Sequence, residues 1–165
     1  MSNMSDAKKN PAAQLWDQLE DVMAVMLGSP DPLQHMQPMS PNPEPAENAI
    51  WFYTRTDSDL ARATGTGGPV HLCLISKDHD YHACLHGQLE VIHSRDHIER
   101  YWNSVVSAWY EGGKDDPALT MLRFTPQTGA IWASTDSTLK FGWEIAKANL
   151  TSETPDVGYT AKLTF

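Results

Sequence analysis

The sequence predicts an α+β protein that is mainly β and is built around an antiparallel barrel. Three observations support this prediction. Short segments of alternating apolar or β-branched residues recur along the chain and are separated by turn residues. Helical patterns fall between these hairpins and do not alternate with every strand, which excludes a parallel α/β sheet. At 165 residues the chain is long enough for one domain with a single buried core.

The N-terminal third of the chain mixes one helical pattern with two Pro-containing segments. Residues 1–11 are polar, and we expect a disordered tail there. Pro38 places a predicted strand at His35–Ser40 on the edge of a sheet, and the prolines of Pro41–Asn48 predict a loop. A helix is predicted over Ala12–Leu27, because apolar residues recur at helical spacing at Leu15, Leu19, Val22, Met23 and Met26.

The clearest strands are Val70–Ser76 and Tyr81–Ile92, which form a predicted antiparallel hairpin closed by Lys77–Asp80. Alternate residues from Tyr81 to Val91 lie on one face of the strand and most of them are apolar, so we expect this face to point into the core. Just before the hairpin, an aromatic strand is predicted at Ile50–Thr54, and Ser58 is in the N-cap region of a short helix, Leu60–Ala63.

The C-terminal half adds helices and further strands. Ser94 caps a predicted helix with one aromatic side, and Leu139–Leu150 is a predicted last helix. Alternation over Tyr159–Phe165 predicts a closing strand. A second β pair is predicted, in which the strands Leu119–Thr125 and Ala130–Ser134 are joined by a turn at Pro126–Gly129.

Composition limits the partners and the compartment. The formal charge of −9 and the pI near 5.1 argue against a nucleic-acid partner. No apolar run approaches the roughly 20 residues of a membrane-spanning helix. The polar N-terminal segment has no apolar stretch typical of a secretory signal. With two cysteines and no export signal, we expect reduced thiols in a cytoplasmic protein.

Two neighbouring segments carry groups that could hold a phosphorylated ring compound. The hydroxyls of Thr54 and Ser58, with the amides that open the short helix, are suitable phosphate donors. His35, Gln37 and Met39 alternate along one strand, so they could line one cavity. The alternative interpretation is an ordinary helix cap beside an ordinary strand, and the residues alone leave it open.

A loop rich in glycine follows the aromatic helix. Its sequence is Gly112-Gly113-Lys114-Asp115-Asp116-Pro117, in which the glycines allow positive φ and the proline ends any helix. Trp102 and Trp109 are seven residues apart, hence on one face of the predicted helix. Such aromatic residues serve either core and dimer-interface packing or a ligand slot.

The polar face of the predicted hairpin carries histidines and both cysteines. A four-residue turn pairs Cys73 with Cys84 and His71 with His86. Three interpretations stay open: a zinc or other transition-metal site, a cross-strand disulfide, and polar residues that simply line a barrel or an interface. The last is favoured, and no metal site is predicted.

Three segments together resemble the general-stress-protein branch of the pyridoxamine 5'-phosphate oxidase-like split barrels, which bind FMN at a dimer interface. They are Trp102–Trp132, His35–Met39 (HMQPM) and Ile50–Leu60 (IWFYTRTDSDL). The resemblance covers residues 12–165. It implies a six-stranded antiparallel split barrel with flanking helices, working as a homodimer with FMN sites between the subunits.

The resemblance also implies which residues contact the cofactor. In the wider family an aromatic-Thr pair, a Ser and basic residues hold the phosphate, and Tyr53-Thr54 and Ser58 match that pattern. Asp59 stands where a basic residue is expected, and His35 where Arg or Lys is common. Arg55, Arg62 or Lys77 would then supply the positive charge. The full expected set is His35, Gln37, Pro38, Met39, Tyr53, Thr54, Ser58 and Lys77, with Trp109, Lys114 and Trp132 approaching from the partner subunit.

The function implied by the resemblance is that of a stress-related FMN-binding protein, and by extension a flavin-dependent oxidoreductase for a small molecule. No residue of the chain is assigned as a general acid or base, so two alternatives are kept. One is a non-catalytic flavin-binding or flavin-buffering protein. The other is a member that has lost FMN and binds another ligand, such as haem, a deazaflavin or a metal.

Overall fold

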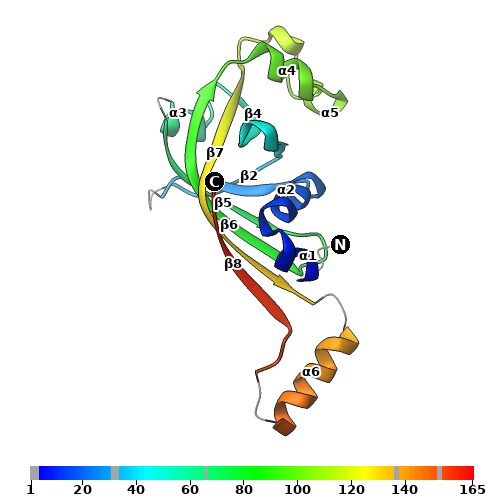
Figure 1. Cartoon of the computed structure of the whole chain (residues 1–165). Coiled ribbons are helices and arrows are strands. Elements are labelled where there is room, and N and C mark those ends of the chain that lie inside the picture. The colour runs from blue at the N-terminus through cyan, green and yellow to red at the C-terminus, as the bar shows by residue number, and fades with distance from the viewer. Residues whose placement is uncertain (1–3, 31–33, 66, 136–137, 152–153) are drawn as a thin grey trace.

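The computed structural model describes residues 4–30, 34–65, 67–135, 138–151 and 154–165. An eight-stranded antiparallel sheet curls into a half-barrel, with helices on its concave side and at its two ends (Figure 1). The predicted fold class is therefore confirmed, although the described sheet has eight strands instead of the six expected.

The elements are defined as follows. The strands are β1 (Val25–Gly28), β2 (Gln37–Met39), β3 (Asn42–Glu44), β4 (Ala49–Arg55), β5 (Gly68–Ile75), β6 (Tyr81–Ile92), β7 (Leu119–Ser134) and β8 (Gly158–Thr164). The helices are α1 (Met4–Lys9), α2 (Pro11–Asp21), α3 (Asp59–Thr64), α4 (Arg95–Tyr101), α5 (Ser104–Ser107) and α6 (Thr138–Thr151), with 3₁₀ turns η1 (Pro45–Glu47) and η2 (Gly113–Asp115).

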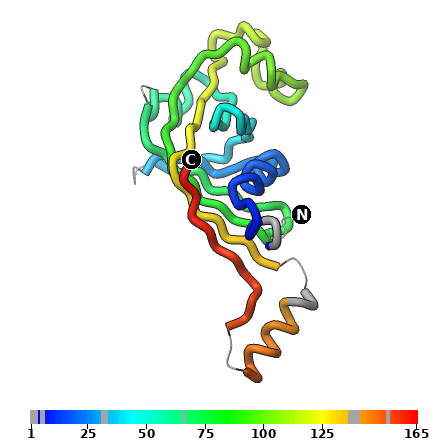
Figure 2. The backbone as a smooth tube through the Cα atoms, in the orientation of Figure 1, coloured from blue at the N-terminus to red at the C-terminus, as the bar shows by residue number. Residues whose placement is uncertain are grey.

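The strand order is β2-β1-β5-β6-β7-β4-β3, and β8 pairs with β7 outside this path. One edge of the long strand β7 is shared: β4 pairs with Leu119–Phe124, and β8 pairs with Thr128–Ser134. The two long strands β6 and β7 run side by side through the whole sheet, and only the other edge of β7 is divided between β4 and β8 (Figure 2). Pro38 lies in the edge strand β2, as predicted.

The β5–β6 hairpin forms in the predicted register. The amide of Ser76 donates to the carbonyl of Tyr81 at 2.9 Å, and Cys73 lies opposite Cys84. Side chains alternate as expected, because Tyr81, Ala83 and Leu85 are buried while His82 and Cys84 between them face outward.

The turn predicted at Pro126–Gly129 is wrong, because β7 continues through it as one 16-residue strand. A β-bulge takes its place: the pairing with β6 shifts between His86 and Gly87, and Gln127 has no partner in the register. A Cβ at Gly87 would collide with the Thr125 carbonyl oxygen, so only glycine permits this close approach.

The N-terminal region differs from the prediction in three places. Residues 4–9, expected in a disordered tail, form α1, where Met4 and Ala7 are buried; residues 1–3 lie outside the described part. The predicted helix at 12–27 ends at Asp21, since the following residues pair as β1 with both β2 and β5. The predicted loop at 41–48 contains β3 and η1.

The aromatic helix is broken into α4 and α5 at Trp102 and Asn103. The side-chain oxygen of Asn103 accepts hydrogen bonds from the amides of Val105 and Val106, at 2.9 and 3.0 Å, and so starts a new helix. Trp102 and Trp109 therefore do not share one helix face. A small second core forms here beneath α4, separate from the main core between the sheet and α2.

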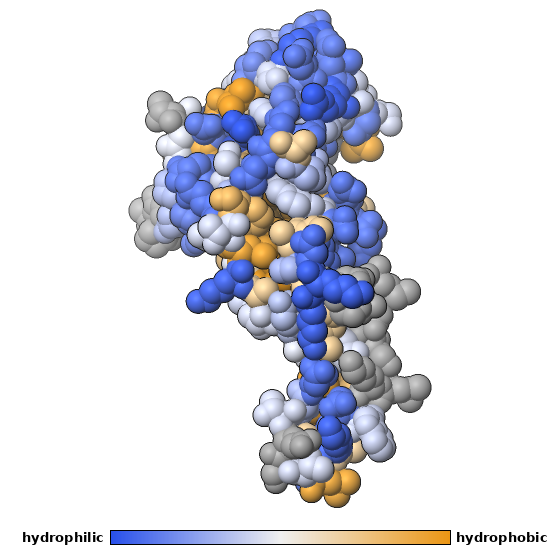
Figure 3. Space-filling model, viewed as in Figure 1, coloured by the Kyte–Doolittle hydropathy of each residue, from blue (hydrophilic) through white to orange (hydrophobic). Residues whose placement is uncertain are grey.

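The predicted C-terminal helix and strand are confirmed as α6 and β8. With β8, α6 forms an arm that projects from one end of the sheet (Figure 1). The space-filling view shows hydrophobic surface at the far tip of this arm (Figure 3). Among the described residues, no helix combines the length and the apolar character that a membrane span requires.

Candidate functional site

The candidate site is built on the turn that joins β4 to α3. Ser58 is the N-cap of α3, and its hydroxyl oxygen accepts a hydrogen bond from the amide of Ala61 at 3.2 Å. The hydroxyl of Thr54, only 8% exposed, donates to the same oxygen at 2.9 Å. The Ser58 hydroxyl accepts these two bonds and keeps its own proton to donate to a ligand.

A cavity of about 510 Å³ opens beside this turn. One wall comes from the segment that leads into β2 and the other from α3, so residues far apart in the chain meet here. The volume is in the range typical of small-molecule sites. The lining residues are Gln34, His35, Gln37, Asp59, Arg62 and Ala63.

Arg62 is the cation that the cavity wall supplies. Its guanidinium lies 3.7 Å from the Asp59 carboxylate, and both side chains are well exposed. Nearby, Arg55 pairs with Asp57 at 3.1 Å, also in solvent. Exposed ion pairs of this kind contribute little stability, so a phosphate can compete for either guanidinium at small cost.

Of the residues predicted to hold a ligand, His35 and Gln37 line the cavity, and Thr54 and Ser58 form its adjoining turn. Tyr53 points elsewhere: its hydroxyl donates to the Ile98 carbonyl at 2.6 Å, and burial raises the pKa of Tyr53 to about 12. Met39 packs against the main core, and Pro38 lies exposed on the sheet edge.

The remaining predicted residues lie at two opposite ends of the sheet. Lys77 is in the β5–β6 turn and Trp132 is near the same end of β7, whereas Trp109 and Lys114 belong to the α4–η2 end. Leu119 and Trp132 are separated by about 40 Å along β7 at the usual rise of a strand. One chain therefore brings four of the eleven predicted residues to the cavity and its adjoining turn.

The Gly-Gly-Lys-Asp-Asp-Pro loop is held in one conformation by Asp116. Its carboxylate accepts hydrogen bonds from the amides of Ala118, at 2.8 Å, and Gly112, at 3.1 Å, which lower the pKa of this carboxyl. Gly113 has a φ of +63°, a conformation that favours glycine. Arg95 of α4 adds bonds to the Lys114 carbonyl and the Asp115 carboxylate.

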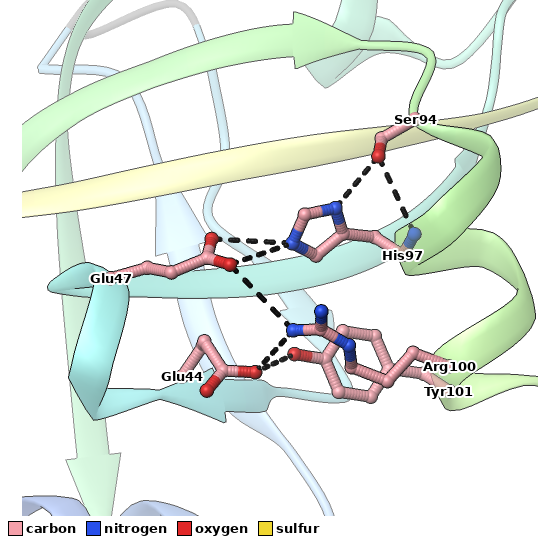
Figure 4. Close-up of polar contacts among 6 residues, drawn as sticks. All are labelled: Glu44, Glu47, Ser94, His97, Arg100 and Tyr101. Atoms are coloured by element: carbon pink, nitrogen blue, oxygen red, sulfur yellow. Dashed lines mark hydrogen bonds and ion pairs between the residues drawn. The ribbon is translucent and has the colours of Figure 1, made fainter.

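Sequence reasoning missed a polar network that attaches α4 to η1 (Figure 4). Arg100 donates to Glu44 at 2.7 Å, and the Tyr101 hydroxyl donates to the same carboxylate at 2.9 Å. These bonds hold the pKa of Glu44 below its usual value. His97 lies 3.2 Å from Glu47, 2.7 Å from the Ser94 hydroxyl, and stacks on Trp51 at a centroid distance of 3.9 Å.

The only sequence signal of this network is the spacing of His97, Arg100 and Tyr101, three and four residues apart on one helix face. Their acidic partners lie about 50 residues away, where a loop was predicted. The network fixes the position of α4, and through Arg95 it fixes that of the glycine-rich loop as well.

The histidine–cysteine face has the predicted register. The Cys73 and Cys84 sulfur atoms lie 3.8 Å apart as free thiols, and the His71 and His86 rings are 5.4 Å apart. Within the described part of the chain, no three His, Cys, Asp or Glu side chains are arranged to hold a metal ion.

Comparison with known proteins gives a consistent family. Residues 10–156 match the family described as pyridoxamine 5'-phosphate oxidase like. A general stress protein 26 from Jannaschia sp. CCS1 is 37% identical with a TM-score of 0.80, covering 98% of this chain and 100% of that one. No curated protein gave a match.

Two further structures are similar. The general stress FMN/FAD binding protein of Xanthomonas citri is 35% identical with a TM-score of 0.69, over 75% of this chain and 89% of that one. A protein from Clostridium acetobutylicum related to general stress protein 26 shares the fold at 21% identity and a TM-score of 0.62, over 73% and 87% of the two chains. The family match over residues 10–156 and the similarity to the Jannaschia protein show that this chain belongs to the pyridoxamine 5'-phosphate oxidase-like family.

Proposed function

We propose that this protein is an FMN-binding protein that uses the flavin to oxidise or reduce a small molecule. The observation that carries the proposal is the cavity in which His35 and Gln37 face Arg62, beside the Thr54–Ser58 hydroxyl pair. It is supported by the similarity to a Xanthomonas citri protein described as FMN/FAD binding.

The donors around this cavity fit the phosphate of FMN. The Ser58 proton and the Arg62 guanidinium offer one neutral and one charged hydrogen bond to a phosphate oxygen. Asp59 opposes this charge, and its exposed carboxylate already pairs with Arg62. We therefore expect moderate affinity that falls as salt is added.

The polar side chains on the β2 side suit the edge of the flavin ring. Gln37 offers both a carbonyl and an amide, which match the alternating acceptors and donors there. When bound, FMN supplies the electron transfer. The residues of the chain bind and orient it, and Thr54 fixes the Ser58 hydroxyl at 2.9 Å.

We also propose that the working form is a homodimer. Trp109 is 77% exposed and Trp132 46% exposed, and both are far from the cavity within one chain. Exposed aromatic residues of this kind are enriched in protein interfaces. In a symmetric pair, Trp109 and Lys114 of one protomer would complete the cavity of the other. Trp132, at the opposite end of the sheet, is too far from them to line the same cavity. Light scattering at micromolar concentration tests this, and a folded monomer would contradict it.

The first experiment on the cofactor is a visible absorbance spectrum after incubation with FMN and desalting. We expect a flavin spectrum near one equivalent per chain. Arg62→Glu places a second negative charge in the cavity wall and should weaken FMN binding at least about tenfold. The matched control is Lys9→Glu, which makes the same charge change at the exposed end of α1. Equal affinity in both variants would contradict the phosphate assignment.

Turnover is tested separately, by following NADH or NADPH oxidation by the FMN-loaded protein with an added electron acceptor. Steady oxidation above that of free FMN supports the oxidoreductase. Bound flavin without turnover would instead support a flavin-holding role. Loss of the flavin on desalting, with another chromophore retained, would point to a different ligand.

A further inference from the structure

The outer face of the β5–β6 hairpin holds the two cysteines of the chain directly opposite each other. Cys73 of β5 is in register with Cys84 of β6, and the Cys73 thiol donates to the Cys84 sulfur at 3.8 Å. Both are free and partly exposed. They lie on a different part of the sheet from the α3 cavity, so the proposed flavin site does not use them.

The position in the ladder suits a cross-link. Ser76 and Tyr81 are a hydrogen-bonded pair, and pair types alternate along an antiparallel ladder. Cys73 and Cys84, three positions further, are therefore a non-hydrogen-bonded pair, in which Cα atoms lie about 4.5 Å apart. Disulfides form between cysteines whose Cα atoms are about 4.4–6.8 Å apart. The two sulfur atoms, now 3.8 Å apart, would have to move about 1.8 Å closer to reach the length of an S–S bond.

We propose that Cys73 and Cys84 are a reversible redox pair that a hydroperoxide converts into a disulfide joining β5 and β6. One thiolate first attacks a peroxide oxygen, the O–O bond breaks, and a sulfenic acid and an alcohol, or water, are formed. The second thiol then attacks the sulfenic sulfur, an S–S bond forms, and the oxygen leaves as water. The thiols lose two electrons and two protons, and the peroxide gains them.

The surroundings of the pair set the speed of this reaction. Burial, with the neighbouring Cys84 acting in the same direction, raises the pKa of Cys73 to about 11. The titratable neighbours on this face are the imidazoles of His71, His82 and His86 and, one strand beyond Ala130, the ammonium of Lys162. Met26 and Ala130 flank the pair on the adjoining strands. The thiolate is scarce at neutral pH, so oxidation should be slow and speed up roughly tenfold per pH unit between pH 7 and 9.

The test treats the full-length protein with hydrogen peroxide, with and without FMN. We expect the free thiols to fall from two per chain to none, and peptide mapping without reductant to find Cys73 linked to Cys84 within one chain. The Tm should rise by about 5 °C, because the cross-link restricts the unfolded chain, and dithiothreitol should reverse both changes. Two thiols that persist, or a disulfide between chains, would overturn the proposal. Both readouts are independent of flavin binding.

A matched variant separates the pair from single-cysteine oxidation. Cys84→Ser leaves Cys73 without a resolving partner, so peroxide should give a sulfenic acid that dimedone traps, with no rise in Tm. The double variant Cys73→Ser/Cys84→Ser should not respond at all. A Tm rise of the same size in either variant would show that the effect does not come from this disulfide.

Discussion

The helices α4 and α6 are attached to the sheet in opposite ways. On α4, Ile98 is fully buried and His97 stacks on Trp51, which is 3% exposed. The carboxylates of Glu44 and Glu47 bind the polar side of the helix. On α6, Trp143 is 68% exposed, and Phe141 and Leu150 are also open to solvent. Contacts within the chain determine where α4 lies, whereas Phe141, Trp143 and Leu150 of α6 leave much of their apolar surface in solvent.

This contrast bears on the proposed site. The α4 region carries Trp109 and the glycine-rich loop, and in the proposed dimer its rigid attachment would hold these residues in place for the second copy. A 14-residue helix without tertiary packing is marginal in water. Substitutions in the two regions should therefore have very different effects on stability.

The largest effect is expected from Trp51→Ala, which empties the second core and removes the surface on which His97 stacks. The free energy of unfolding should fall by about 3–5 kcal/mol, as for other buried aromatic residues replaced by alanine. Urea unfolding followed by circular dichroism measures this. A loss below about 1 kcal/mol would show that the second core does not hold α4.

A smaller, pH-dependent effect is expected from Glu44→Gln, which weakens the bonds from Tyr101 and Arg100. The free energy of unfolding at pH 7 should fall by about 1 kcal/mol. The folded pKa of Glu44 is lowered from 4.5, so its contribution is present above that pH and is lost as the pH falls through the folded value.

The same unfolding measurement at about pH 3 should therefore show a smaller difference between wild type and Glu44→Gln than at pH 7. Thr151→Val at the exposed end of α6 is the control, since it also removes one hydrogen-bonding group but no charge. A difference that does not change with pH would contradict the assigned role of the carboxylate.

The smallest effect is expected from Trp143→Ser on α6. Its indole is mostly in solvent, so the free energy of unfolding at low protein concentration should change by less than about 0.5 kcal/mol. A loss close to that of Trp51→Ala would mean that α6 is covered in solution. Light scattering on the same variant would then report whether a second copy covers it.

Local patterns predicted the parts of the fold in which neighbours along the chain also meet in space. The β5–β6 register followed from four turn residues, and the cap at Ser58 followed from residue type. The helix predicted at 12–27 failed because β1 pairs with two distant strands, and these long-range bonds outweigh a helical stripe. Asn103 is a helix-capping signal that was present and overlooked.

In the candidate site, too, contacts between residues close in sequence were predictable and contacts between distant residues were not. Thr54 and Ser58 are four residues apart, and sequence reasoning placed them together correctly. Arg62 was one of three possible cations, and only the fold shows that it, and not Lys77, lines the cavity in the described chain. Glu44 and Arg100 are 56 residues apart, and no local pattern links them.

The edge of β7 that is divided between β4 and β8 also has consequences for the order of folding. The β5–β6 hairpin closes through a short turn, but β4 must find β7 across some 65 residues of chain, and β8 is synthesised only after α6. Contacts that are distant in sequence form slowly, because loop closure costs entropy before any pairing compensates for it. On the ribosome, the edge of β7 beyond Thr128 therefore stays unpaired until β8 has emerged, and during that interval it is open to wrong strand partners.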